Sequence, residues 1–199
     1  MGSEVAGKAD VKTAIVLTAA GMSRRFRHAS GQHKLLAVLQ GKAVLRHSLE
    51  QARASGMDII VVTRPEDKAI HVLLDNVRAV FCVSQGLGDS IAAGVSACLD
   101  YDAVIIALGD MPFVTTDSYQ AVEQALHASP LVRPWVKGQP GHPVGFQRAF
   151  FPALQQLSGD TGAQHLLLNQ QIRYVPLSDR GCLEDIDYPE DLLRVRSSS

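Results

Sequence analysis

Short apolar runs alternate with amphipathic helical patterns through the first 128 residues, and this alternation restricts the possible folds more than any other feature of the chain. Strands are predicted at 11–18, 57–63, 78–84 and 101–110, and helices at 42–56, 66–75, 88–100 and 116–129. The fourth strand, "YDAVIIALGD", is apolar almost throughout, as parallel strands buried on both faces are. The order predicts an α/β fold with a doubly wound, mostly parallel sheet flanked by helices, the Rossmann-like arrangement.

The pattern changes after Pro130. The segment "LVRPWVKGQPGHPVGF" predicts two extended pieces joined by a Gly/Pro turn. Short helices are predicted at 150–157 and 161–169, then a strand at 172–177 and a helix from Pro189. No repeat or low-complexity linker separates the halves. We therefore expect residues 11–196 to form one domain, with a small β/α cap from the C-terminal half, and residues 1–10 to form a disordered tail.

Composition excludes several classes of protein. Hydrophobic residues make up 46% of the 199 and charged residues 20%, as in soluble globular proteins. A formal net charge of −1 offers no basic field for nucleic acid, and no apolar run approaches the roughly 20 residues of a membrane span. Three dispersed cysteines without a CxxC pair, and a polar N-terminus unlike a signal peptide, favour the cytoplasm.

The end of the first predicted strand combines small residues with positive charge. The strand runs into Thr18, Ala19, Ala20 and Gly21, and the cations that follow are Arg24, Arg25, Arg27 and Lys34. Small side chains beside cations suit a bound phosphate chain, whereas the alternative is a surface loop with solvated arginines. Neither the GxGxxG fingerprint nor a GK[ST] sequence is present here, which argues against a dehydrogenase and a P-loop NTPase.

Two further segments carry carboxylates towards the same edge of the sheet. Asp110 ends the fourth strand in "ALGDMPF", where an aspartate suits Mg²⁺ shared with phosphate oxygens or, alternatively, caps the next turn. Near the C-terminus, "EDIDYPEDLLRV" places Glu184, Asp185 and Asp187 before a helix, a position that acidic residues also favour without any ligand. Each segment is ambiguous alone, but their order along the chain is informative.

These motifs, taken together, resemble those of the molybdenum cofactor cytidylyltransferases within the MobA-like nucleotidyltransferases. The resemblance covers residues 13–196 and comprises, in order, "LTAAGMSRR" with Lys34, "QGLGDSIAAGV", "GDMP", "GQPGHPVGF", "SGDTGAQHLL" and "DIDYPEDL". Two departures stand out. Arg25 and Lys34 are nine positions apart rather than about five, because "RHASGQH" lengthens the loop, and Tyr188 replaces the usual threonine.

The resemblance implies transfer of CMP from CTP to the terminal phosphate of the molybdenum-pterin cofactor, with release of pyrophosphate. Residues 11–128 would then be the nucleotide-binding half and residues 129–196 the acceptor-binding half. The implied cofactor is Mg²⁺, with Mn²⁺ as the alternative ion. Partners would be CTP, the molybdenum-pterin cofactor and an apo-molybdoenzyme that receives the product, but neither nucleic acid nor a membrane.

The implied site residues fall into four sets. The catalytic residues are Arg25 for the departing phosphates, Lys34 for the α-phosphate, and Asp110. The nucleotide-binding residues are Thr18, Ala19, Ala20, Gly21, Met22, Ser23, Arg25, Lys34, Gln85, Gly86, Ser90 and Asp110. The acceptor-binding residues are Met111, Pro112, Gly141, His142, Pro143 and Asp160. The metal ligands are Asp110 and Asp187.

Several assignments have a competing interpretation. The alanine at position 20 resembles the cytosine-using members of the group, since the guanine-using members tend to carry a second glycine there. Gln85 could form hydrogen bonds with the edge of a pyrimidine base. His142 either contacts the acceptor or fixes a Gly/Pro turn, and Asp160 either binds the acceptor or caps a helix. The rival functions are another NTP or phosphorylated acceptor, a carrier chaperone for the molybdenum cofactor, and an oxidoreductase.

Overall fold

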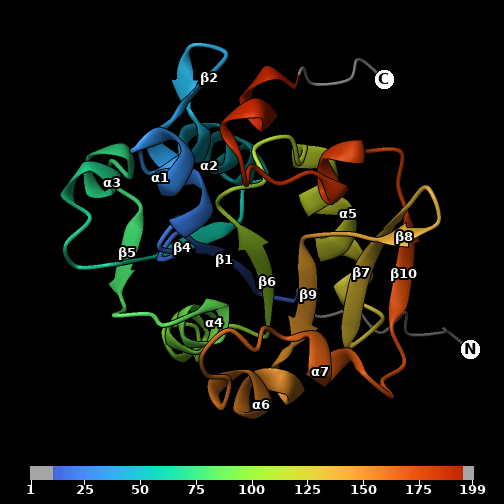
Figure 1. Ribbon diagram of the computed structural model, residues 1–199. Coiled ribbons are helices and arrows are strands. Elements are labelled where there is room, and N and C mark those ends of the chain that lie inside the picture. The colour runs from blue at the N-terminus through green and yellow to red at the C-terminus, as the bar shows by residue number, and fades with distance from the viewer. Residues whose placement is uncertain (1–10, 195–199) are drawn as a thin grey trace, which may run out of the picture.

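The computed structural model describes residues 11–194, and its centre is an eight-stranded sheet with the order β10-β7-β9-β6-β1-β4-β5 (Figure 1). These strands are β1 (Thr13–Thr18), β4 (Asp58–Thr63), β5 (Arg78–Phe81), β6 (Ala103–Leu108), β7 (Leu131–Val136), β9 (Val144–Gln147) and β10 (Arg173–Pro176), with β8 (Gln139–Pro140) paired to β7. Four strand pairs are parallel, namely β1 with β4, β1 with β6, β4 with β5, and β7 with β10, and three are antiparallel, namely β9 with β6, β9 with β7, and β8 with β7. The sheet is therefore mostly parallel, as predicted.

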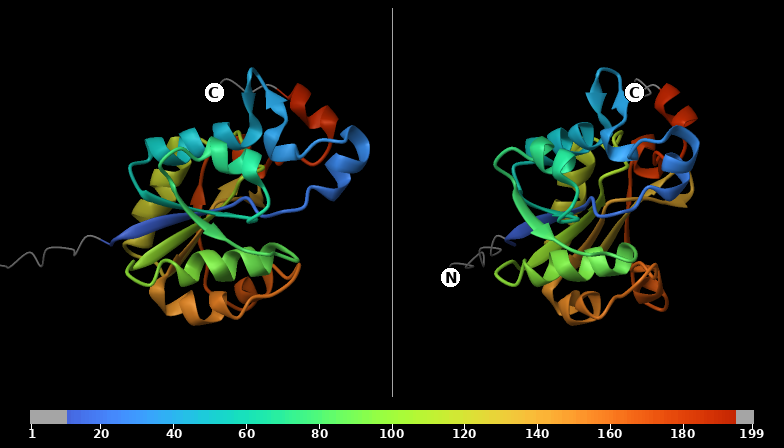
Figure 2. Two further views of the ribbon diagram at one scale, coloured as in Figure 1. Left: turned by 90° about the vertical axis from the view of Figure 1, so that its left-hand side faces the viewer. Right: turned by 60° about the vertical axis from the view of Figure 1, so that its left-hand side comes forward.

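Helices cover both faces of the sheet (Figure 2). One face packs against α2 (Val44–Ala54), α3 (Lys68–Leu73) and α5 (Thr116–Leu126), and the other against α4 (Leu87–Ser96), α6 (Phe151–Gln155) and α7 (Gln164–Leu167). β1 shows why both faces are covered. Ile15 and Leu17 belong to the first apolar cluster, whereas Val16 belongs to the second, following the two-residue period of a strand. The doubly wound, Rossmann-like fold predicted from the alternation is confirmed.

The remaining elements are short. α1 (Arg24–Ser30) follows β1, and β2 (Val38–Leu39) pairs with β3 (Lys42–Ala43) in a separate hairpin. Single 3₁₀ turns occur at Lys34–Leu36, Arg148–Phe150, Arg180–Leu183 and Pro189–Leu193. No helix within residues 11–194 has the length and apolar character to cross a membrane.

Three local predictions differ from the structure. The helix expected from Lys42 begins at Val44, because Lys42 and Ala43 pair with β2. The helix expected from Pro189 is a 3₁₀ turn. The lengthened loop after Arg25 is largely the helix α1, which ends at Gly31 in the left-handed conformation (φ 72°). The tail predicted at residues 1–10 lies outside the described residues.

The second half of the chain extends the sheet of the first half. β9 pairs with β6 and β7, and β10 pairs with β7 at the edge. The segments that follow β1, β5 and β6 meet at one side of the sheet, where Thr18, Ser84 and Asp110 line one cavity. Ligands of parallel α/β sheets bind at this side, because the carboxyl ends of the strands leave a crevice there.

Candidate active site

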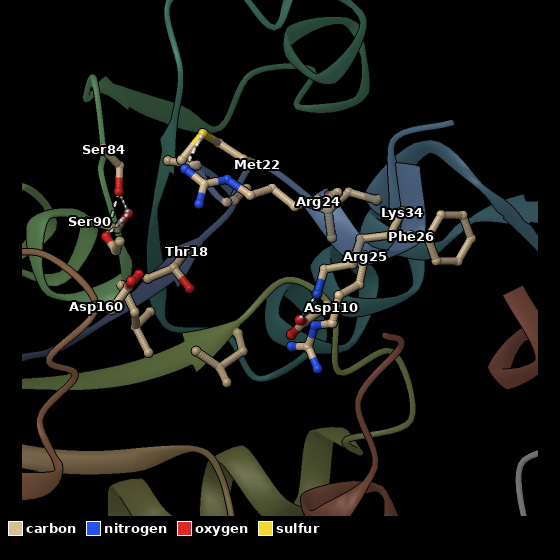
Figure 3. A pocket seen from close by; sticks show the side chains of 18 of the residues that line it. Thr18, Met22, Arg24, Arg25, Phe26, Lys34, Ser84, Ser90, Asp110 and Asp160 are labelled. Carbon is tan, nitrogen blue, oxygen red and sulfur yellow. Dashed lines mark hydrogen bonds and ion pairs between the residues drawn. The ribbon is translucent and has the colours of Figure 1, made fainter. Parts of the chain in front are cut away.

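A cavity of about 340 Å³ opens at the carboxyl ends of β1 and β6 (Figure 3). All twelve residues predicted to bind nucleotide line it. Arg25, Lys34 and Asp110 lie on one side, Ser84 and Ser90 on the other, with Thr18 between them (Figure 3). We call Arg25, Lys34, Asp110 and Asp187 the charged wall, and residues 84–90 with 159–160 the facing wall.

The backbone after β1 is hydrogen-bonded to the neighbouring strands at its start and faces open space at Gly21. The Thr18 hydroxyl donates to the Ala107 carbonyl at 3.3 Å, and the Ala19 N–H donates to the Val62 carbonyl at 2.7 Å. A Cβ placed on Gly21 would meet no atom of the described chain within 4 Å. Gly21 is therefore not required by packing, and its missing side chain leaves room for a ligand to approach the backbone.

His33 supports this loop from beneath and was not predicted as a functional residue. The residue is 5% exposed, and its Nε2 lies 3.2 Å from the Gly21 carbonyl oxygen. Nδ1 accepts from the Leu35 N–H at 3.2 Å, so Nε2 carries the proton and donates to Gly21. Burial lowers the pKa of His33, which favours this neutral form. The sequence signal was its place directly before Lys34.

Lys34 and Arg25 converge on Asp187 despite the lengthened spacing. Lys34 Nζ lies 2.6 Å from Asp110 Oδ2 and 3.2 Å from Asp187 Oδ1, and Arg25 Nη1 lies 2.8 Å from Asp187 Oδ2. Burial alone would lower the pKa of Lys34, but Asp110 and Asp187 outweigh it and raise the pKa. A hydrogen bond to Tyr188, then the charge of Asp187, raises the pKa of Arg25. Both groups are firmly cationic.

Three carboxylates gather beside these cations. Asp110, Asp185 and Asp187 each offer an oxygen within 4.8 Å of the others. The Ile186 N–H donates to the Asp110 carbonyl at 2.8 Å, and the Ile186 side chain is fully buried. Since side chains alternate along an extended segment, burial of Ile186 turns both flanking aspartates towards the site. Asp185 was not predicted as a ligand, although the D-x-D spacing carried the signal.

These residues fit a divalent cation. Carboxylate oxygens are the donors that Mg²⁺ and Mn²⁺ prefer. Desolvation, followed by the charges of Asp110 and Asp187, raises the pKa of Asp185, so the cluster holds negative charge that a cation would neutralise. Gly109 fixes the turn before Asp110, because a Cβ there would lie 2.8 Å from the Thr18 carbonyl oxygen.

The facing wall is built mainly from backbone and small side chains. Ser90 Oγ donates to Ser84 Oγ at 3.0 Å, and Gln85 is exposed to solvent. A Cβ on Gly86 would collide with Gly159 and Asp160, so the two segments approach as closely as glycine permits. They form one continuous surface.

Asp89 joins the two segments of the facing wall. Its carboxylate accepts from the Gln85 N–H at 2.8 Å and from the Gly159 N–H at 3.0 Å. The first of these bonds, followed by the second, lowers the pKa of Asp89. The bond to Gly159 joins residues 70 positions apart in the sequence, so only the folded chain brings them together.

The residues predicted to bind the acceptor do not all reach a cavity. A second cavity of about 470 Å³ adjoins the first, and His142 and Asp160 line it. Met111 packs into the first apolar cluster, and Gly141 lies against Cys182, whose carbonyl oxygen would be 2.7 Å from a Cβ there. Pro112 and Pro143 are buried as well. These four residues lie outside the lining of both cavities because they pack the turns beneath.

Comparison with families of known proteins gives one match over most of the chain. Residues 14–174 match the MobA-like NTP transferase domain. The purine catabolism protein PucB of Bacillus subtilis is 31% identical over 91% of this chain and 94% of its own length. The molybdenum cofactor cytidylyltransferase of Escherichia coli is 26% identical over the same shares, 91% and 94%.

Solved structures agree with the fold. Rv0371c from Mycobacterium tuberculosis superposes with a TM-score of 0.80, 25% identity, and coverage of 91% of this chain and 95% of its own. A structure of Rv0371c in complex with manganese gives a TM-score of 0.75 at 24% identity, over 90% and 94% of the two chains. The second likeness shows the fold alone, and the manganese belongs to that protein.

Proposed function

This chain belongs to the MobA-like NTP transferase family, and we propose that it transfers CMP from CTP to the terminal phosphate of the molybdenum-pterin cofactor. The observation that supports a transfer of this kind is the charged wall itself. Two cations and a group of carboxylates meet at the mouth of a cavity whose floor is an open backbone loop. Such a site suits a triphosphate and a divalent cation together.

The reaction requires no strong general base, because a phosphate monoester is already anionic near neutral pH. An oxygen of the acceptor phosphate attacks the α-phosphorus of CTP, a P–O bond forms, and the bond to the β-phosphate breaks as pyrophosphate leaves. The obstacle is the approach of two polyanions, so the work of the protein is positioning and charge neutralisation.

Each side chain then has a role. Arg25 neutralises the departing β- and γ-phosphates, and Lys34 neutralises the α-phosphate. The backbone N–H groups of 20–23 approach the triphosphate, since Gly21 leaves that approach open. Asp110, Asp185 and Asp187 would hold Mg²⁺ or Mn²⁺. A bound cation of this kind supplies charge stabilisation to phosphate oxygens.

The alternative is the same chemistry with another NTP or another phosphorylated acceptor. The observation that favours it is the similarity to PucB, which is higher in identity than that to the molybdenum cofactor cytidylyltransferase. The two candidates share the charged wall and differ in the base of the nucleotide, in the acceptor, or in both.

The test is pyrophosphate release with Mg²⁺ and purified molybdenum cofactor, with CTP, GTP, ATP and UTP offered in parallel. The proposal expects release with CTP and little with the others. Release with GTP instead would agree with nucleotidyl transfer but refute cytosine as the base that the site selects. Release from none of the four nucleotides would refute the molybdenum cofactor as the acceptor. The same assay would then be repeated with other phosphorylated acceptors.

A further inference from the structure

His33 ends the segment by which this chain departs from the spacing of its family. The extra residues "RHASGQH" lie between Arg25 and Lys34, and His33 is the last of them. Its side chain is buried, yet it is absent from the lining of the first cavity. Histidine is an intermediate residue in its preference for burial, and a buried imidazole needs partners for both ring nitrogens. The partners of His33 therefore indicate what the lengthened segment does.

The surroundings of the ring fix the position of its proton. Nδ1 accepts from the Leu35 N–H at 3.2 Å, so the proton of the neutral ring lies on Nε2. Asp67 Oδ2 lies 3.9 Å from Nε2, which is too far for a hydrogen bond, but its negative charge favours a proton there. Asp67 directly precedes α3, yet its side chain makes no capping bond to that helix. Its Oδ2 is buried and has no hydrogen-bond partner among the described residues.

The proton on Nε2 fixes the orientation of one peptide unit in the loop that follows β1. Nε2 lies 3.2 Å from the Gly21 carbonyl oxygen and donates to it. The C=O and the following N–H of a trans peptide point in opposite directions, so the Met22 N–H points away from His33. Gly21 and Met22 line the first cavity, whereas His33 does not (Figure 3). The Met22 N–H therefore points to the cavity side of the loop.

This peptide unit has few other restraints. Glycine rotates freely about its backbone bonds, and a Cβ on Gly21 would meet no atom of the described chain within 4 Å. Ser23, two residues on, adopts the left-handed conformation with φ 52°, and its Oγ lies 3.4 Å from His33 Nδ1. His33 thus contacts the loop on both sides of Met22. A donor that is already oriented binds an anion without the entropic cost of ordering it.

We propose that His33 is a positioning residue of the nucleotide site, which holds the Gly21–Met22 peptide with its N–H pointing at a phosphate oxygen of the NTP. His33 itself touches no substrate and acts through the loop. The inference rests on the proposed function in one respect, because it needs a triphosphate in the first cavity. It adds the residue that orients one phosphate donor, and it holds for any base and any acceptor.

Two substitutions separate this role from a purely local one, in which His33 caps the 3₁₀ turn at Lys34–Leu36 by accepting from Leu35. His33→Gln places an amide donor near the position of Nε2 and retains the bond to Gly21. His33→Asn places an oxygen near the position of Nδ1 and retains only the bond from Leu35. The positioning role therefore tolerates glutamine, whereas the capping role tolerates asparagine.

The test is a calorimetric titration with inorganic tripolyphosphate and Mg²⁺, a probe that carries the phosphates of an NTP without a base. His33→Asn should raise the Kd about tenfold, because a hydrogen bond to a charged group loses its orientation. His33→Gln should stay within about threefold of the wild type. The matched control is His28→Asn, which changes an exposed histidine of α1 outside the cavity lining and should leave the Kd within about twofold.

The opposite order of the two His33 variants, or equal Kd values for them, would overturn the proposal in favour of the capping role. A wild type that does not bind tripolyphosphate would overturn it as well. Thermal unfolding would check that each variant folds.

A measurement on the wild type does not depend on whether the variants fold. In an amide NMR titration with the same probe, the Met22 amide proton should move downfield, because it gains a phosphate oxygen as acceptor. The amide proton of Gly138, in the turn between β7 and β8, is the control and should not move. A Met22 amide proton that stays in place while tripolyphosphate binds would refute the inference.

These titrations contain neither base nor acceptor, so their outcome separates from that of the proposed reaction. Tripolyphosphate binding that depends on His33, without pyrophosphate release from any NTP, would support this inference and refute the proposed function. Pyrophosphate release with CTP, together with tripolyphosphate binding that is unchanged in His33→Asn, would do the reverse.

Discussion

The charged wall is made of ionised side chains that pair with one another, whereas the facing wall is made mainly of backbone, serines and glycines, with the Asp89 carboxylate joining its two segments. In the charged wall, Lys34 bridges Asp110 and Asp187, which are 76 and 153 positions away in the sequence. In the facing wall, Gly86 and Gly159 approach so closely that a Cβ on Gly86 would collide. The difference indicates two kinds of sensitivity. The charged wall should respond to loss of charge, and the facing wall to loss of close approach.

The largest effect is expected at the charged wall. Asp110→Asn removes a carboxylate that contacts Lys34 at 2.6 Å and belongs to the acidic cluster. Turnover should fall about a hundredfold or more, with a smaller change in the Michaelis constant for CTP, because the lost charge acts mainly on the transition state. Steady-state pyrophosphate release measures both. The matched control is Asp102→Asn. Asp102 is an exposed aspartate directly before β6, the strand that Asp110 follows. Near-normal turnover of Asp110→Asn would contradict the role of this wall.

A second variant tests whether Asp185 belongs to the metal site together with Asp110 and Asp187, the two ligands predicted from the sequence. Asp185→Asn should raise the Mg²⁺ concentration for half-maximal turnover about tenfold, as the loss of a metal-supporting group typically does. A Mg²⁺ titration of the rate is the measurement. Glu184→Gln, its neighbour outside the cluster, should leave the titration unchanged. If both variants behave alike, Asp185 does not belong to the metal site.

The facing wall is tested by removing the Asp89 carboxylate, which joins its two segments. Asp89→Ala removes the carboxylate that bonds to the Gln85 and Gly159 N–H groups. Because these segments border both cavities, the Michaelis constants for CTP and for the acceptor should rise together, each about tenfold. Steady-state kinetics with each substrate varied in turn would measure this. Asp100→Ala, an exposed aspartate just beyond α4, is the control. A change confined to one substrate would mean that the two segments are not coupled.

The smallest effect concerns base choice. Ala20 is 1% exposed and belongs to the second apolar cluster, so its methyl group contributes to packing. Ala20→Gly should lower the free energy of unfolding by about 1 kcal/mol and shift the CTP-to-GTP preference only a few-fold. Thermal unfolding and parallel rates with the two nucleotides check both parts. A complete switch to GTP would show that one methyl group governs the base.

Much of the fold was predictable because it follows from local periodicity. The four apolar runs of the first half became β1, β4, β5 and β6, and the helices between them have the expected order. The residues of "LTAAGMSRR" and "GDMP" were identified as a candidate site because parallel strands end at one edge. The apolar periodicity did not predict α1. This helix consists largely of arginine and histidine, and Phe26 is the one residue of it that is buried.

Other parts of the site depended on contacts that no local pattern reveals. His33 is buried beneath Gly21 although histidine is more often exposed, and Asp89 bonds to a residue 70 positions away. The motif around Gly141 and Pro143 suggested an acceptor site, yet both residues are buried and only His142 reaches the cavity. A motif identifies a segment, and packing decides which of its side chains face a ligand.

The sequence by itself determined the strand–helix order, the burial of β6 on both faces and the candidate chemistry of a phosphate loop with aspartates at strand ends. These follow from the period of side chains along the backbone and from the chemistry of each residue type. The tertiary structure alone decided that Asp185 lies beside Asp110, and that Arg133 lines the second cavity and bonds to the Gly141 carbonyl. Such groupings arise from pairing of segments far apart in the chain, and a single local pattern carries no record of them.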